Sequence, residues 1–181
     1  FAARSQSPVQ RIQHVLHSHP ALSPLLVLAA ASIVFSLINS RFAEPGSISL
    51  VLQQAAIIAA LAIGQTLIIL TAGIDLSCGV IMALGSIVMT KFAVDLGLPA
   101  PLAILAGIGV TALFGLLNGL LVTRIKLPPF IVTLGTFNIA FAITQLYSGA
   151  QTVTEVPPLM TWLGNTFPLG GANVAYGTVL I

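Results

Sequence analysis

The segment QTLIILTAGIDLSCG (65–79) decides the fold of this chain. It starts with a continuous apolar run and ends on small and polar residues around Gly73 and Asp75. Glycine readily adopts the left-handed backbone that ends a helix, and aspartate is a favoured N-cap of the next one. The segment therefore predicts two helices joined by a tight break that includes Gly73, Asp75, Ser77 and Gly79.

This helix break has two compatible interpretations. In the first, Asp75 only caps the following helix, because its carboxylate accepts backbone N–H groups and complements the helix dipole. In the second, an ionisable residue at a broken helix marks a solute path or a moving joint. An aspartate at the centre of a membrane helix costs about 2.5–3.5 kcal/mol on insertion scales, so it is seldom kept there without a role.

The composition places these helices in a membrane. Only 6 Lys and Arg and 4 Asp and Glu occur among 181 residues, whereas 57% of the residues are hydrophobic and the mean hydropathy is +1.07. A soluble domain carries about 25% charged residues. These values exclude a soluble enzyme, a disordered chain and a nucleic-acid binder, and one cysteine, Cys78, excludes an intrachain disulfide framework.

The predicted fold class is all-α, a polytopic transmembrane helical bundle. A helix needs about 20 apolar residues to cross the hydrocarbon core, and continuous apolar runs argue against barrel strands. We expect five complete spans, at about 21–40, 48–71, 76–93, 100–122 and 130–147, and the start of a sixth at 174–181. Residues 1–20 are expected to form a cytoplasmic flank with an interfacial amphipathic segment, and 21–181 the transmembrane domain.

The few cations predict the orientation. Lys and Arg without neighbouring acids collect on the cytoplasmic side of membrane proteins. Two such pairs occur, Arg4 with Arg11 and Arg124 with Lys126. This predicts a cytoplasmic N-terminus, with 72–75 and 123–129 inside and 41–47, 91–99 and 148–173 outside.

Uncharged polar residues within the spans suit a path for a neutral, hydroxyl-rich solute, because ion paths more often show acidic rings or buried ion pairs. Asn118 has two readings, as an interhelical hydrogen-bonding group or as path lining, and the nearby Gly115 and Gly119 have the spacing of close helix packing. The candidate substrate-path residues are Gln53, Gln54, Gln65, Asp75, Asn118, Thr133, Asn138 and Gln145.

We expect neither catalysis nor a metal or cofactor in this chain. No nucleotide-binding, zinc-protease or serine-nucleophile motif occurs, and no pair of carboxylates. His14, His17 and His19 cluster in the N-terminal flank, but no carboxylate or thiol accompanies them, which favours a solvated segment over a metal site.

Two motifs together resemble a known family. LTAGIDLSCG (70–79), followed by GLLNGLLVTRIKLPPFIVTLGT (115–136), resembles the membrane permease of ABC importers for monosaccharides, the family of the ribose, xylose and fructose permeases. The likeness covers about 45–150. RIQHVLHSHPALSPLLVL (11–28) and LQQAAIIAALAIGQTLIILTAGIDLS (52–77) look most like the fructose permeases, and Cys78 stands where relatives usually carry a Val-like residue.

The resemblance implies a subunit of the bacterial inner membrane that pairs as a homodimer. It also implies a periplasmic sugar-binding protein and a separate cytoplasmic ATP-binding subunit as partners. A complete permease of this family has about ten helices, so we expect the chain to be its N-terminal portion, incomplete at the C-terminus. The alternative functions are a secondary carrier or facilitator for a small neutral solute, and a purely structural membrane scaffold. A proton-coupled carrier needs a titratable residue deep in a span, and Asp75 is the sole candidate.

Overall fold

The computed structural model describes residues 16–169 and 171–180. The chain divides into two compact units between Leu50 and Val51. The first unit contains α2 (Leu22–Ile38), the 3-10 helix η1 (Ser40–Ala43) and the start of α3 (Pro45–Leu70). The Ser47 hydroxyl donates to the Arg41 carbonyl at 2.8 Å and stabilises the turn that leads into α3. Most of the expected amphipathic segment before Leu16, together with His14, lies outside the described residues.

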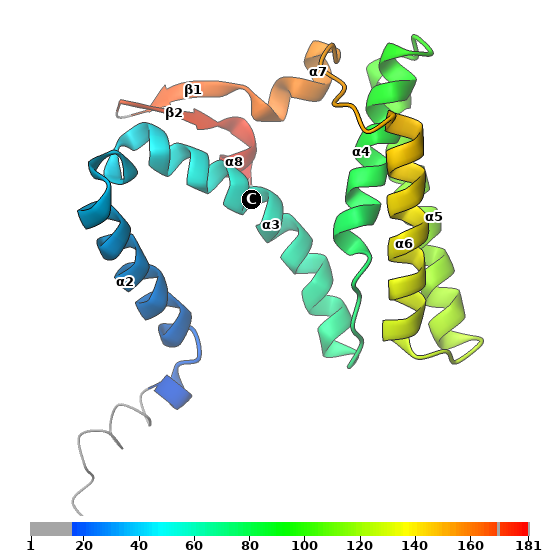
Figure 1. Cartoon of the computed structure of the whole chain (residues 1–181), viewed down its shortest axis with the longest axis horizontal. Coiled ribbons are helices and arrows are strands. Elements are labelled where there is room, and N and C mark those ends of the chain that lie inside the picture. The colour runs from blue at the N-terminus through cyan, green and yellow to red at the C-terminus, as the bar shows by residue number, and fades with distance from the viewer. Residues whose placement is uncertain (1–15, 170, 181) are drawn as a thin grey trace, which may run out of the picture. The chain divides into compact units, whose positions relative to one another are not determined.

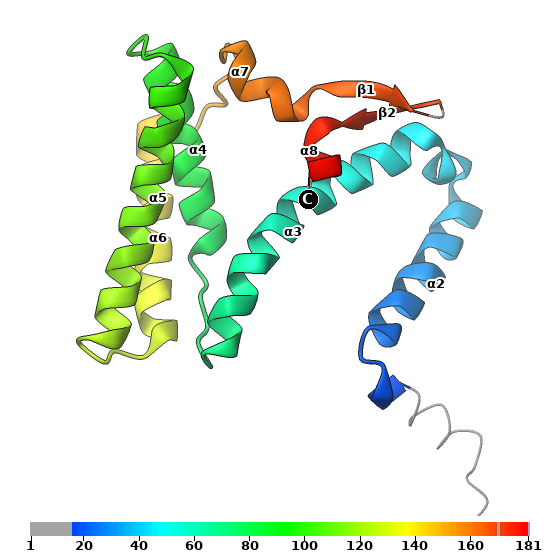
Figure 2. The same ribbon diagram turned by 180° about the vertical axis from the view of Figure 1, so that it is seen from behind.

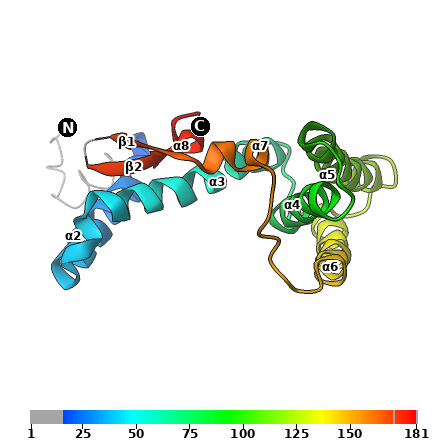
Figure 3. The ribbon, with the colours of Figure 1, turned by 90° about the horizontal axis from the view of Figure 1, so that it is seen from above.

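Three helices of the second unit form a bundle: α4 (Cys78–Val94), α5 (Ala100–Thr123) and α6 (Pro129–Ser148) (Figure 1). Each contacts the other two, and the view along their axes shows them side by side (Figure 3). Ile81, Leu84 and Val88 of α4 pack with Ala140 of α6 in a small apolar core. The bundle is therefore centred on α4, which directly follows the helix break.

Each of the five predicted complete spans coincides with a helix whose ends lie within three residues of the prediction. Among the described residues, α3, α5 and α6 are long and apolar enough to cross a membrane. The apolar helices α2 and α4 have 17 residues each, or about 26 Å at 1.5 Å per residue, slightly less than the roughly 30 Å hydrocarbon core. The helical membrane fold is confirmed, and the number of complete spans stays a prediction.

After α6 the chain forms a hairpin that the sequence analysis did not predict, whereas the helix expected to start at 174–181 begins within two residues of that prediction. Strand β1 (Thr166–Leu169) pairs antiparallel with β2 (Ala172–Ala175), and the helix α8 (Tyr176–Leu180) begins after the second strand. Gly171, in the connection, has a φ of 86°. Two glycines between apolar runs are a hairpin signal, because glycine tolerates the positive φ of a two-residue turn.

The hairpin is continuous with two short helices, α7 (Pro158–Thr161) and η2 (Trp162–Gly164). The rings of Trp162 and Tyr176 stack with centroids 5.4 Å apart, and the Tyr176 N–H donates to the Asn165 carbonyl at 3.0 Å. These contacts hold Tyr176 at the point where α8 begins. They give a defined structure to a region that the sequence predicted only as an external loop.

The helix break and the α5–α6 turn lie at the same end of the bundle, and the α4–α5 turn lies at the other, as Figures 1 and 2 both show. Pro129 occupies the first turn of α6, as the Pro pair predicted. Lys91 and Asp95 form an ion pair at 2.9 Å at the opposite end. This arrangement agrees with placing 72–75 and 123–129 on one side of the membrane.

Close packing of α4 on α5 depends on two glycines. A Cβ on Gly107 would come within 2.6 Å of the Gly85 carbonyl oxygen and 3.0 Å of the Met89 side chain. In contrast, nothing among the described residues lies within 4 Å of a Cβ on Gly115 or Gly119. Close helix approach occurs in this bundle, but at Gly85 and Gly107 rather than at the Gly115–Gly119 pair.

We predict that Gly107→Ala destabilises the bundle by about 1–3 kcal/mol, because the new methyl group overpacks the α4–α5 contact. Gly109→Ala is the matched control on the same helix, since nothing lies within 4 Å of its Cβ position. The control should be neutral or slightly stabilising, as alanine favours helix over glycine. Thermal unfolding of the detergent-solubilised chain measures both, and equal unfolding temperatures would contradict this packing.

We also predict that cysteines replacing Arg124 and Lys126 react with an impermeant thiol reagent only from the cytoplasmic side. Cysteines at Asp95 and Leu96 should react only from the outer side, because the α4–α5 turn lies at the opposite end of the bundle. Labelling of intact cells against inverted membrane vesicles, in a Cys78→Ala background, measures both sets. Labelling of positions 124 and 126 from outside would reverse the proposed orientation.

Candidate functional site: the polar helix break

The helix α3 ends in a Schellman motif. The Gly73 N–H donates to the Ile68 carbonyl at 3.0 Å, and the Ala72 N–H donates to the Ile69 carbonyl at 2.9 Å. The left-handed residue is Ala72, with a φ of 57°, which corrects the expectation that Gly73 takes this conformation. At Gly73 a Cβ would make a tight contact, 3.2 Å from the Ile68 carbonyl oxygen.

Asp75 holds Ser77 through two hydrogen bonds. Its Oδ1 accepts from the Ser77 N–H at 2.7 Å and from the Ser77 hydroxyl at 2.6 Å. Ser77, which is fully buried, is the N-cap residue of α4. The N-cap is therefore Ser77 and not Asp75, and Asp75 stabilises the break through an Asx-type turn just before the helix.

Side chains from three helices bind the break. Gln65 of α3 donates from Nε2 to the Asp75 carbonyl at 3.0 Å. Asn118 of α5 donates from Nδ2 to the Ser77 Oγ at 2.9 Å. Thr133 of α6 donates to the Ile74 carbonyl at 3.2 Å and to the carbonyl of its own helix at Pro129 at 2.9 Å. These contacts connect α3, α5 and α6 to the start of α4.

The network is incomplete on its acceptor side. Among the described residues, Gln65 Oε1 and Asn118 Oδ1 are buried without a hydrogen-bond partner. A buried acceptor without a partner costs about 1–3 kcal/mol. Several hydrogen bonds therefore stabilise the observed arrangement, whereas the two buried acceptors without partners destabilise it. A rearrangement that brings donors to these oxygens lowers this free-energy cost.

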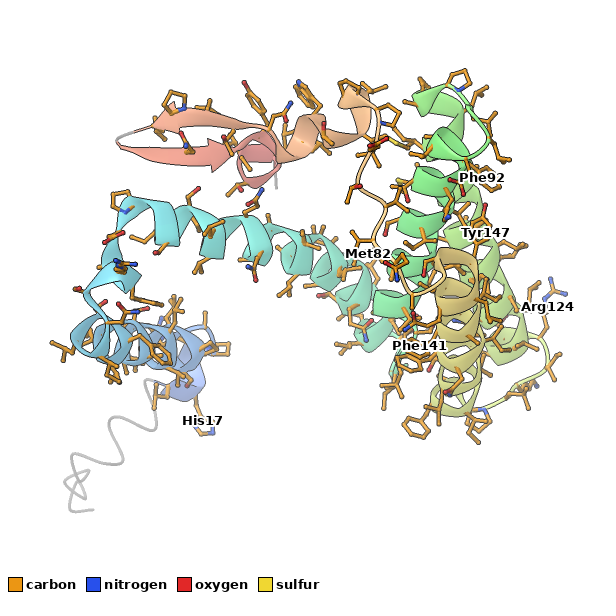
Figure 4. All side chains as sticks on the ribbon, turned by 45° about the horizontal axis from the view of Figure 1, so that its top comes forward. His17, Met82, Phe92, Arg124, Phe141 and Tyr147 are labelled. Carbon is orange, nitrogen blue, oxygen red and sulfur yellow. The ribbon has the colours of Figure 1, made fainter. Side chains whose placement is uncertain are left out.

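A cavity of about 310 Å³ borders the break between α3, α5 and α6. Its polar lining comes from Thr71, Asp75, Asn118, Thr123 and Thr133. A second, more apolar cavity of about 380 Å³ reaches Asp75 from the α4–α5 side and includes Cys78, Met82 and Met89; Met82 is labelled in Figure 4. Asp75 thus borders two mostly apolar cavities, one on the α3, α5 and α6 side and one on the α4–α5 side.

A family model for "Branched-chain amino acid transport system / permease component" matches residues 47–180. The matched part contains the helix break, the whole α4–α6 bundle and the hairpin. The chain belongs to this permease family.

Similar proteins are sugar import permeases by their names. The chain is 43% identical to the fructose import permease protein FrcC of Rhizobium meliloti over all of its own length and 52% of that protein. It is 41% identical to the ribose import permease protein RbsC of Bacillus subtilis over 74% of the chain and 41% of the relative. For the galactofuranose transporter permease protein YtfT of Escherichia coli, the identity is 39% over 64% of the chain and 33% of the relative.

The chain spans about half the length, or less, of the curated relatives that it matches. No solved structure matches the chain significantly.

The structure brings together half of the candidate substrate-path residues. Gln65, Asp75, Asn118 and Thr133 meet at the break, and the interhelical reading of Asn118 agrees with its hydrogen bond to Ser77. The other four lie elsewhere: Gln53 borders a cavity of about 240 Å³ beside η2 and α8, and Gln54, Asn138 and Gln145 are exposed on α3 and α6. A contact between any of the eight and a substrate stays a prediction.

The sequence reasoning missed two lining residues, Thr71 and Thr123, of the cavity between α3, α5 and α6. Both hydroxyls also donate within their own helices, to the Ile68 and Gly119 carbonyls. Both lie at helix ends, Thr71 next to the break and Thr123 next to the α5–α6 turn. This position is the signal in the sequence by which they could have been found.

We predict that Asp75→Leu destabilises the α3–α4 break by about 1–3 kcal/mol, because the N–H and hydroxyl of the buried Ser77 lose the acceptor that they share. Asp75→Asn keeps an oxygen at this position and should retain most of the stability. The matched control is Asp95→Leu, which removes a half-exposed carboxylate from a surface ion pair and should cost at most about 1 kcal/mol.

The thermal stability and the membrane insertion of these variants should be measured together. Normal unfolding of Asp75→Leu beside normal unfolding of Asp95→Leu would show that the Asp75–Ser77 contact does not support the break.

Proposed function

We propose that this chain forms part of the membrane-spanning permease subunit of an ATP-driven ABC importer. The cargo is a monosaccharide of the fructose or ribose type, and the membrane is the bacterial inner membrane. The single observation that carries the proposal is the 43% identity with a fructose import permease along the whole of this chain. Fructose is the first candidate, since the ribose permease of Bacillus subtilis matches only 74% of the chain.

The chemistry of the spans supports a neutral cargo. Inside the four helices α3, α4, α5 and α6 themselves, the only charged residue is Lys91, which pairs with Asp95 at one end of the bundle. The polar groups beside the break are hydroxyls and amides, together with the Asp75 carboxylate that already accepts two hydrogen bonds. Such groups exchange hydrogen bonds with a sugar without binding a cation strongly.

The features of the helix break support the proposal that α3 and α4 are connected by a movable joint. A rigid helix pair transmits motion only as a unit, whereas a broken helix lets one half turn against the other. The break is held by hydrogen bonds of Gln65, Asp75, Asn118 and Thr133 rather than by a large apolar contact, and two buried acceptors have no partner among the described residues. These features fit a joint that has a second arrangement in the transport cycle.

The partners follow from the same proposal. A second permease subunit completes a homodimer, a cytoplasmic ATP-binding subunit hydrolyses the nucleotide, and a periplasmic binding protein delivers the sugar. The permease itself is not an enzyme and needs no cofactor, and its N-terminus is cytoplasmic. A secondary carrier is less favoured, because Asp75 lies at a helix break and is occupied by Ser77.

Deletion of the gene that encodes this chain, followed by restoration with an intact copy, tests the proposal. Uptake of radiolabelled fructose and ribose at micromolar concentration should fall to background on deletion and return on restoration. Depletion of ATP at a maintained proton gradient should stop the uptake, and a protonophore at maintained ATP should not.

Two results would contradict the proposal. Uptake that follows the proton gradient and not ATP would favour the secondary carrier. Uptake of both sugars that is unchanged by deletion would exclude them as cargo.

A further inference from the structure

Three side chains at the helix break form a chain of hydrogen bonds, which we call the relay. Asn118 Nδ2 donates to the Ser77 Oγ at 2.9 Å, and the Ser77 hydroxyl donates to the Asp75 Oδ1 at 2.6 Å. Ser77 is 0% exposed and Asn118 is 7% exposed. The hydroxyl and the amide therefore lie inside the described chain, out of reach of any segment that covers the outside of these helices.

The number of protons fixes the direction of the relay. A carboxylate only accepts hydrogen bonds, and a serine hydroxyl has a single proton to donate. Because Asp75 takes that proton, Ser77 can only accept from Asn118, so the amide points its nitrogen at Ser77 and its oxygen elsewhere. Asn118 Oδ1 is accordingly buried without a partner among the described residues. This unmet acceptor is a consequence of the direction in which the relay runs.

The same three side chains have a second arrangement in which the acceptor is satisfied. If the Ser77 hydroxyl donates to Asn118 Oδ1, the Asn118 amide nitrogen is free to donate to the Asp75 carboxylate. The relay keeps its number of hydrogen bonds, and Asp75 keeps both a charge-assisted bond and its contact with the Ser77 N–H. Asp75 Oδ1 and Asn118 Nδ2 already share Ser77 Oγ as a neighbour, so a small displacement of α5 exchanges the two arrangements.

The packing of α5 on α4 determines which displacement is open to it. The tight contact between Gly85 and Gly107 lies about 16 Å from Asn118 along α5, at 1.5 Å per residue. A contact between helix backbones resists sliding, so the movement left to α5 is a rotation about this point. Such a rotation displaces Asn118 more than the residues near Gly107.

We propose that the relay is a two-position switch that couples the rotation of α5 to the α3–α4 joint. The Ser77 hydroxyl donates to Asp75 in the observed position and to Asn118 in the second. The observed position carries the cost of the unmet acceptor and the second carries the cost of displacing α5, which keeps both accessible. Ser77 and Asn118 are positioning residues in this inference, which rests on the movable joint of the proposed function.

Removal of both hydrogen-bonding groups tests the switch, because it separates transport from stability. Ser77→Ala combined with Asn118→Leu replaces both partners by apolar side chains, which costs little stability. ATP-dependent sugar uptake in the deletion strain should nevertheless fall on the order of ten-fold, a usual size for the coupling of two sites. The matched control on α4 is Ser86→Ala with Thr90→Val, whose hydroxyls donate to carbonyls of α4 itself. It should leave both uptake and unfolding temperature unchanged.

Reversal of the relay is a second test, which does not require apolar side chains at the break. Asn118→Asp alone places two carboxylates beside the single Ser77 proton, so both uptake and unfolding temperature should fall. Addition of Asp75→Asn restores the match, because the new amide donates to Ser77 Oγ and the new carboxylate accepts from the hydroxyl. The double variant should recover most of the lost uptake, and Ser77→Ala in this background should abolish the recovery.

Two results would overturn the switch. Normal uptake by the apolar double variant would show that the relay only stabilises the break. If that variant does not fold, the reversal decides: no recovery of uptake on adding Asp75→Asn to Asn118→Asp would show that the direction of the relay has no role in transport.

A failure of the proposed function gives a different result. If the unaltered gene restores no ATP-dependent uptake of fructose or ribose, the proposed function is wrong whatever the variants do. The unfolding temperatures still test the relay in that case. Ser77→Ala and Asn118→Leu each leave a buried partner unmet, so their separate losses should exceed the loss in the double variant, whereas additive losses would refute the relay.

Discussion

The structure depends on satisfying the backbone polar groups of the 71–77 break between α3 and α4. A helix crosses a membrane because its N–H and C=O groups bind one another, and a break gives up this solution. Here the Ile74 and Asp75 carbonyls accept hydrogen bonds from Thr133 and Gln65, and the Ser77 N–H donates to the Asp75 carboxylate. Side chains thus replace the missing helical hydrogen bonds.

The same groups determine how the helices meet. Gln65, Asn118 and Thr133 belong to α3, α5 and α6, and each binds a position just before α4. Apolar contacts give little direction in a membrane, since lipid tails and leucine side chains are similar, whereas hydrogen bonds and close backbone contacts are specific. The break at one end and the Gly85–Gly107 contact further along α4 together fix the register of the bundle.

Much of this fold could be predicted because its signals are local. Long charge-free runs placed the five main helices, and Pro128 with Pro129 placed the start of α6. The partners at the break could not be predicted, because Asn118 and Ser77 lie 41 residues apart and meet only through packing. Local rules also gave the wrong residue for the left-handed turn, since the Schellman hydrogen bonds place Ala72 there while Gly73 lies close to Ile68. The hairpin was missed although Gly170 and Gly171 offered a local signal.

The polar residues of the spans fall into two groups with different physical consequences. The group at the break binds the Ile74 and Asp75 carbonyls and the Ser77 hydroxyl, so it stabilises the observed arrangement, and two acceptors without partners among the described residues limit that stability. The group on α6, Asn138 and Gln145, faces away from the bundle, and its one side-chain hydrogen bond among the described residues runs from Asn138 to the Leu134 carbonyl of the same helix. The positions of the amides therefore separate the residues that hold the break together from those on the outer face of α6.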